Sequence, residues 1–199
     1  MQLIENHIFH VYNRGNNKQP IFFKPDNYLF FLKKIRKHLL PVCEILAYCL
    51  MPNHFHLLIQ ADSRSVALAN PENTRMPTQK FSRGLQTLLS SYSKAIQIQE
   101  KLTGSLFQQR TKAKQVSSEW SWEDYSLICF RYILHNPVAA GLVNSPDDWE
   151  YSSCRDFAGI RSGTLCNQNL VYKTLNLEWN TLEGLVNQPL TEQESLRIF

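Results

Sequence analysis

Residues 51–60 read MPNHFHLLIQ, a proline-containing turn followed by an apolar run that holds two histidines. The composition and length of this run predict a short β-strand that begins near His54. Successive side chains of a strand point to opposite faces, so His54 and His56 share one face and the apolar residues share the other. Two imidazoles on one face of a strand with a buried back would form half of a divalent-metal site.

The flanking sequence predicts the rest of a sheet. β-branched and aromatic residues predict three more strands, at residues 6–13, 42–50 and 105–110. Apolar residues at helical spacing predict two amphipathic helices, from Asp26 to Pro41 and from Thr78 to Leu102. Residues 61–77 lack any periodicity and predict a surface loop.

The predicted order of elements is strand, helix, strand, strand, helix, strand. This order is the split βαβ pattern of an α+β, ferredoxin-like βαββαβ sandwich. Its four strands form an antiparallel sheet, and its two helices cover one face of that sheet. The other face stays available, and the strand with the two histidines would present them there.

A further helix is predicted from Ser121, a residue suited to an N-cap, to about His135, and Pro137 stops it. Tyr132 and Asn136 lie four residues apart and therefore share a face of this helix. Two imidazoles and one carboxamide oxygen can hold Mg²⁺ or Mn²⁺ and leave positions open for a phosphate oxygen. A phenolic oxygen could then attack phosphorus. Tyr92 is the alternative nucleophile, but it has no amide four residues further on.

Five separated stretches resemble the single-tyrosine HUH transposases, and in particular their REP-associated tyrosine transposase branch. The stretch MPNHFHLLI resembles the His-hydrophobic-His motif of that family, and RYILHNPVAAGLV, residues 131–143, resembles its catalytic-tyrosine helix. The other three are HVYNRG at 10–15, GSLFQQR at 104–110 and WEYSS at 149–153. The resemblance covers residues 6–157.

The resemblance implies a protein that cleaves single-stranded DNA beside a hairpin through a 5′-phosphotyrosine intermediate and leaves a free 3′-OH. By position it implies that Tyr132 is the nucleophile and that His54, His56 and Asn136 bind the divalent metal. Many transposases of the simplest insertion sequences have glutamine at the last position, whereas asparagine is typical of the REP-associated branch. We therefore predict a DNA cleavage domain over residues 1–157 and a C-terminal extension over residues 158–199.

Charge and composition agree with an anionic partner. The net charge is +4, and residues 61–120 hold nine basic against four acidic side chains, which favours nucleic acid. We expect Arg14, Arg110, Lys112 and Lys114 to contact DNA phosphates, although solvated surface charge explains such residues equally well. The five scattered cysteines suit reduced thiols, and neither a signal peptide nor a long apolar run is seen. We expect a bacterial, cytoplasmic, nucleoid-associated protein without membrane contact, either a monomer or a homodimer.

Two other functions fit the same sequence. A ferredoxin-like module could bind nucleic acid through basic and aromatic side chains without catalysis. A metal-dependent nuclease could instead activate water and cut without a covalent adduct.

Overall fold

The fold is described from a computed structural model of the chain. The structure describes residues 1–72, 75–116, 122–177, 184, 190–191 and 194, and the side chains of residues 122–124 are left out of the description. The predicted N-cap Ser121 therefore lies outside the described residues. Within the described part of the chain, no helix is both long and apolar enough to cross a membrane.

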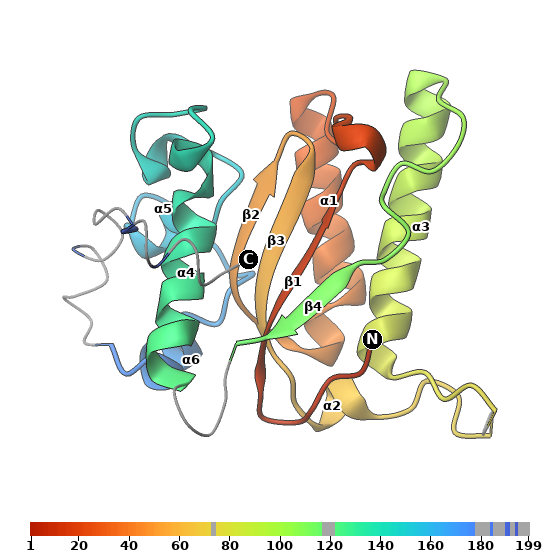
Figure 1. Cartoon of the computed structure of the whole chain (residues 1–199), viewed down its shortest axis with the longest axis horizontal. Coiled ribbons are helices and arrows are strands. Elements are labelled where there is room, and N and C mark those ends of the chain that lie inside the picture. Colours follow the sequence, from red (N-terminus) through yellow and green to blue (C-terminus); the bar gives the residue numbers. More distant parts are fainter. Residues whose placement is uncertain (73–74, 117–121, 178–183, 185–189, 192–193, 195–199) are drawn as a thin grey trace.

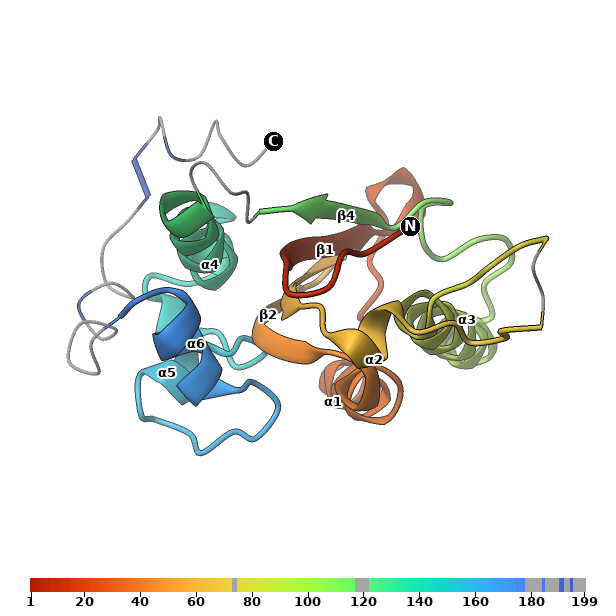
Figure 2. The ribbon, with the colours of Figure 1, turned by 90° about the horizontal axis from the view of Figure 1, so that it is seen from below.

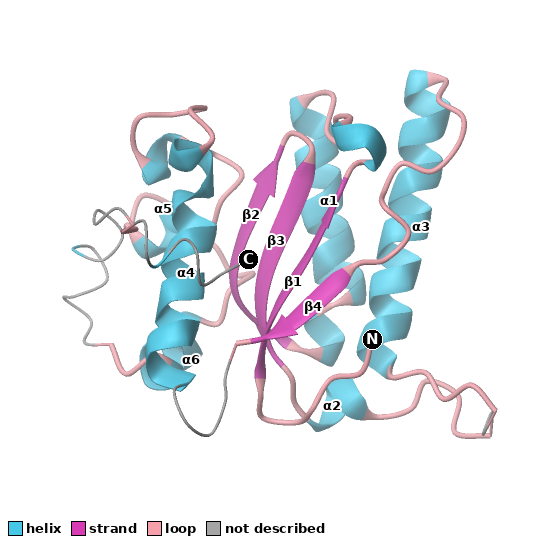
Figure 3. Cartoon of the chain, viewed as in Figure 1, coloured by secondary structure: helices cyan, strands magenta, loops and turns pink. Residues whose placement is uncertain are grey.

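A four-stranded antiparallel sheet forms the centre of the molecule, in the order β2-β3-β1-β4 (Figure 1). Its strands are β1 (Ile8–Arg14), β2 (Glu44–Met51), β3 (His54–Gln60) and β4 (Lys112–Gln115). The two long helices α1 (Pro25–His38) and α3 (Lys80–Glu100) lie side by side on one face (Figure 3). This arrangement confirms the predicted α+β, ferredoxin-like fold.

The main core lies between the sheet and these two helices. Phe31 of α1 is fully buried, with its ring centroid 5.2 Å from that of Phe55 in β3 and 4.9 Å from that of Tyr92 in α3. Phe55 belongs to the apolar face of β3, opposite the histidines. Burial of this face holds the register of the strand, because a slip of one residue would turn both histidines into the core.

The turn between β2 and β3 is held by the chain that follows β1. The backbone N–H of Gly15 donates to the Asn53 carbonyl over 2.7 Å, and that of Ile21 donates to the Pro52 carbonyl over 2.8 Å. A side chain at position 15 would collide with the Gln19 carbonyl oxygen, so glycine is required for this close approach. The turn that precedes His54 is thereby attached to the end of β1.

A second group of helices lies beside β2 (Figure 2). It consists of α4 (Trp122–Ala139), α5 (Cys154–Phe157) and α6 (Gln168–Thr174). Backbone hydrogen bonds join the segment around α5 to β2, from Leu50 N–H to the Tyr151 carbonyl and from Ser153 N–H to the Tyr48 carbonyl, each over 2.9 Å. These bonds cover the edge of the sheet.

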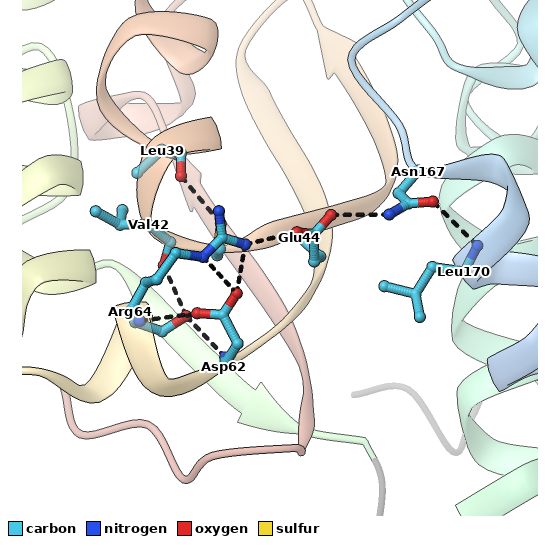
Figure 4. Close-up of polar contacts among 9 residues, drawn as sticks. Leu39, Val42, Glu44, Asp62, Arg64, Asn167 and Leu170 are labelled. Carbon is cyan, nitrogen blue, oxygen red and sulfur yellow. Dashed lines mark hydrogen bonds and ion pairs between the residues drawn. The ribbon is translucent and has the colours of Figure 1, made fainter.

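A polar network ties the start of β2 to α6 and to α2 (Ser63–Val66) (Figure 4). One Glu44 carboxylate oxygen accepts from the Arg64 guanidinium over 2.5 Å, and the other accepts from the Asn167 amide over 3.0 Å. Asp62 caps α2, because its carboxylate accepts from the Ser65 backbone N–H over 3.0 Å and from Arg64 Nε over 2.8 Å.

Three predictions of local structure are wrong. The predicted loop 61–77 contains helix α2. The fourth strand lies at Lys112–Gln115 and not at 105–110, where a single bridge joins Phe107 to Gly15. Helix α4 does not stop before Pro137 but continues to Ala139. The Asp62 cap that starts α2 is a local signal within the predicted loop. Pro137 removes one helical hydrogen bond, and helix α4 continues past it while it packs beside β2.

We predict that Phe31→Ala lowers the free energy of unfolding by about 3–5 kcal/mol, because a buried aromatic ring is removed from a packed core. The matched control is Leu29→Ala on the same helix, where the side chain is 48% exposed. That substitution should change the free energy by less than about 0.5 kcal/mol. Urea unfolding of both variants measures the difference, and similar losses would contradict the position of the core.

A pH dependence follows from Asp62. Burial alone would raise the pKa of this carboxyl, but hydrogen bonds from Arg64 and Ser65 hold it below its ordinary value. The stability that Asp62 contributes is therefore present above about pH 4 and is lost as the pH falls through the lowered pKa.

We expect Asp62→Asn, which keeps a capping oxygen, to narrow the difference in unfolding free energy between pH 6 and pH 3. Glu5→Gln, at an exposed carboxyl, is the control. An unchanged difference in Asp62→Asn would show that the carboxylate charge does not contribute.

Candidate active site

A cavity of about 650 Å³ lies between the open face of the sheet and helix α4. The strands supply Tyr12 and Arg14 from β1 and His54 and His56 from β3, as its lining shows. Helix α4 supplies three polar side chains to the opposite wall, namely Tyr132, His135 and Asn136. The cavity therefore brings together residues that lie about 120 positions apart in the chain.

The two histidines of β3 point to the same face, as their alternate positions predict. Their ring centroids lie 4.9 Å apart with the planes at 85°. His56 is buried, whereas His54 is half-buried at the start of the strand. In the antiparallel register Tyr12 lies opposite His56 and Arg14 lies opposite His54, so β1 adds its own polar side chains to this face.

Asn136 meets both histidines from helix α4. Its Oδ1 lies 3.1 Å from His54 Nε2, and its Nδ2 lies 3.5 Å from His56 Nε2. Tyr132, one helical turn earlier, has its ring centroid 5.4 Å from that of His56. Four of the predicted site residues thus line the same cavity, namely His54, His56, Tyr132 and Asn136. Their chemical roles remain predictions.

The two nitrogens of His54 both face oxygen atoms. Nδ1 lies 2.6 Å from Asn53 Oδ1, and Asn53 is held in this orientation because its Nδ2 donates to the Lys18 carbonyl over 3.2 Å. Burial lowers the pKa of His54, so the ring is neutral at pH 7 and has one N–H. One N–H can serve only one of these two contacts. A proton on Nδ1 donates to Asn53 Oδ1, whereas a proton on Nε2 donates to Asn136 Oδ1. Only the first arrangement leaves the lone pair of Nε2 able to bind a cation.

His56 is held by a third histidine. His10 Nε2 lies 2.8 Å from His56 Nδ1, and both side chains are buried. Burial and the nearby Lys114 lower the pKa of His10 to about 3. Burial followed by the charges of His10 and His54 lowers the pKa of His56 well below its ordinary value. Both rings are therefore neutral at pH 7, and His10 contacts His56 directly.

Tyr132 keeps its proton at neutral pH. Burial raises the pKa of its phenol to about 12, while a hydrogen bond with Asn136 opposes this rise. A phenol with so high a pKa is a poor nucleophile until it loses its proton. Any attack by Tyr132 therefore needs removal of that proton as the new bond forms.

The four predicted DNA contacts are divided between two places. Arg14 lines the cavity, and Lys112 lies beside it with its ammonium 5.9 Å from the centroid of the Tyr12 ring. Lys114 lies opposite His10 in the register and 5.2 Å from the centroid of the Tyr125 ring. Arg110 instead lines a separate cavity of about 860 Å³ beside α3, so it does not belong to this group.

Tyr92 is excluded as the alternative nucleophile. Its side chain is fully buried in the main core, and its hydroxyl donates to the Ile21 carbonyl over 2.7 Å. Neither the contact between Asn53 and His54 nor the place of Tyr12 in the cavity was predicted from the sequence. His10, Tyr12 and Arg14 alternate along β1, so the sequence indicates that they share a face of that strand. The pairing of β1 with β3 is needed to show that this face also holds His54 and His56.

Comparison with known proteins finds similarity at the level of structure. No protein-family model matches the chain, and no curated protein matches it in sequence. Among solved structures, a REP-associated tyrosine transposase bound to a REP hairpin is similar to this chain, with a TM-score of 0.54 and 18% sequence identity. The match covers 77% of this chain and 79% of the transposase chain. At this level of identity the two proteins share a fold.

We predict that Tyr92→Phe lowers the free energy of unfolding by about 1–3 kcal/mol, because the buried Ile21 carbonyl loses its donor. Chemical denaturation measures this loss. The variant should keep every activity that depends on the cavity, since Tyr92 lies on the other side of the sheet. Loss of that activity in a variant that remains folded would return Tyr92 to consideration.

Proposed function

We propose that the protein cleaves and rejoins single-stranded DNA through a covalent link to Tyr132, with a divalent cation at His54, His56 and Asn136. The convergence of these four side chains in one cavity supports the proposal most strongly. The shared fold with a transposase that is bound to a REP hairpin is in keeping with it, and so is the resemblance of the sequence motifs to the HUH transposases. We infer that the DNA partner contains a hairpin.

The donor atoms fit a divalent cation. Ligands at adjacent corners of an octahedron, each about 2.1 Å from the ion, lie about 3 Å apart. His54 Nε2 and Asn136 Oδ1 are 3.1 Å apart, and both atoms would be able to bind a cation once the proton of His54 is on Nδ1. Among the described residues, no group of three or more His, Cys, Asp or Glu side chains could hold a metal ion, so this site requires the Asn136 carboxamide.

The two neutral imidazoles and one amide suit Mg²⁺ or Mn²⁺ bound together with a phosphate. They bring no negative charge of their own, so the negative charge would come from the DNA. The bound cation would polarise the phosphodiester and neutralise charge that develops on its oxygens. His54 and His56 would orient the phosphate through that cation.

Tyr132 carries the covalent step. Its Oη forms a bond to phosphorus as the bond from phosphorus to the 3′-oxygen breaks, and the phenolic proton is lost to solvent. The 3′-oxygen takes up a proton and leaves as a free hydroxyl. A DNA 3′-OH can later attack the phosphotyrosine and release Tyr132 with its proton restored. Phenoxide is a better leaving group than an alkoxide, because the pKa of a phenol is about 10.

The open sheet face offers a path for the strand that leaves the cavity. Lys112 beside the Tyr12 ring and Lys114 beside the Tyr125 ring pair a cation with an aromatic face at two places. Phosphates attract the ammonium groups, and bases stack on aromatic rings. Arg14 adds a guanidinium next to His54, where it would face the phosphate.

We predict that Tyr132→Phe binds a single-stranded hairpin oligonucleotide but forms no covalent adduct, since only the phenolic oxygen is removed. Tyr125→Phe on the same helix is the matched control and should form the adduct as the wild type does. A denaturing gel with end-labelled DNA and Mn²⁺ measures the adduct, and a native gel measures binding.

The outcomes of this experiment separate the three functions. An adduct that persists in Tyr132→Phe would reassign the nucleophile. Cleavage without any adduct in the wild type would favour a nuclease that activates water. A shift on the native gel with neither cleavage nor adduct would favour a non-catalytic nucleic-acid-binding module.

We also predict that EDTA abolishes cleavage and that added Mn²⁺ restores it. His54→Ala should abolish cleavage at every Mn²⁺ concentration, because one of the ligands is lost. His7→Ala, at a histidine outside the cavity, is the control. Cleavage that persists in EDTA would remove His54 and His56 from their proposed role.

A further inference from the structure

His10 is a buried histidine that contacts the candidate metal site through His56. It lies in β1, is 1% exposed, and its Nε2 is 2.8 Å from Nδ1 of His56. The Nε2 atom of His56, on the far side of the same ring, faces Asn136 and the cavity. Within the described part of the chain, the side-chain hydrogen bond of His10 is therefore made to the back of a proposed ligand.

Neighbouring rings hold His10 in this position. Its ring centroid lies 4.7 Å from that of Tyr12, 5.0 Å from that of His56 and 6.1 Å from that of Tyr132. The planes of His10 and His56 are inclined by 27°, and the two rings meet edge to edge along the contact between Nε2 and Nδ1. A ring packed in this way cannot turn away from His56 without displacing the side chains that line the cavity.

The direction of the hydrogen bond between the two rings decides what His56 can do. If His56 donates from Nδ1 to His10 Nε2, the lone pair of His56 Nε2 is free to bind a cation. If His10 donates instead, the proton of neutral His56 sits on Nε2 and blocks that atom. The first arrangement places the proton of His10 on Nδ1, which has no hydrogen-bond partner among the described residues. This unpaired N–H makes the first arrangement costly. We therefore expect the first arrangement when a cation bound to His56 Nε2 offsets that cost.

We propose that His10 is a positioning residue that accepts the hydrogen bond from His56 Nδ1 and thereby directs the lone pair of His56 Nε2 into the cavity. His54 has a counterpart in Asn53, whose Oδ1 accepts from His54 Nδ1 over 2.6 Å. Each proposed metal-binding histidine thus has an acceptor behind it, one from the turn before β3 and one from β1. This inference rests on the proposed function, since it assumes a cation at His54 and His56.

The test compares two substitutions at position 10. In His10→Phe the ring is kept and the acceptor is lost, so the affinity for Mn²⁺ should fall by about 10–100-fold. In His10→Gln the carboxamide oxygen can accept from His56, so Mn²⁺ affinity should stay within a few-fold of the wild type. The electron paramagnetic resonance signal of free Mn²⁺ measures affinity without DNA, and near-UV circular dichroism checks that both variants fold.

A second measurement uses the wild-type protein and does not depend on a variant that folds. Nitrogen-15 labelling of histidine, with diamagnetic Mg²⁺ bound, should place the proton of His56 on Nδ1. A proton on Nε2 in the Mg²⁺-bound protein would overturn the proposal. Wild-type affinity in His10→Phe, or equal losses in the Phe and Gln variants, would overturn it as well, because the acceptor would then not matter.

These outcomes are separate from those of the proposed function. If His10→Phe weakens Mn²⁺ binding but the wild type forms no DNA adduct, the role of His10 stands and the cleavage activity fails. If His10→Phe binds Mn²⁺ normally while the wild type cleaves DNA, only the role of His10 fails. If His56→Ala binds Mn²⁺ as the wild type does, no cation sits at His56 and the inference fails with the proposed metal site.

Discussion

The pairing of β1 with β3 is the constraint on which the candidate site depends. It places Tyr12 opposite His56 and Arg14 opposite His54, and it brings His10 within hydrogen-bonding distance of His56. The apolar face of β3 packs on α1 and α3 through contacts such as that between Phe55 and Phe31. Because the side chains of a strand alternate, the same burial that stabilises the core directs the polar residues of both strands to the open face.

The electrostatic character of the site follows from its burial. It contains neutral imidazoles, an amide and a phenol, and burial lowers the pKa values of His10, His54 and His56. Neutral imidazoles keep a lone pair for a cation, whereas protonated ones would repel it. The cations of the region, Arg14, Lys112 and Lys114, come from the sheet strands and lie around the cavity. The side chains at the centre of the site are neutral, so any negative charge there would have to come from a bound molecule.

Helix α4 supplies the other half of the site, and its position depends on contacts beyond its own sequence. It packs beside β2. The segment around α5 is attached to the same strand by two backbone hydrogen bonds, from Ser153 N–H to the Tyr48 carbonyl and from Leu50 N–H to the Tyr151 carbonyl. Its continuation through Pro137 keeps Asn136 in helical geometry, so that Asn136 and Tyr132 face the sheet from successive turns. The ion pair between Arg131 and Glu194, 2.8 Å in length, also joins Glu194 to this helix.

The fold class, the common face of His54 and His56 and the shared helix face of Tyr132 and Asn136 could all be predicted from local patterns. These are consequences of periodicity, since a strand repeats every two residues and a helix repeats about every 3.6. The three-dimensional arrangement was needed to show that the two halves meet, that Arg110 lines a different cavity, and that Tyr92 is a core residue. It also decided the partners His10 and Asn53, because hydrogen bonds between distant segments depend on strand register and turn geometry, which no local pattern encodes.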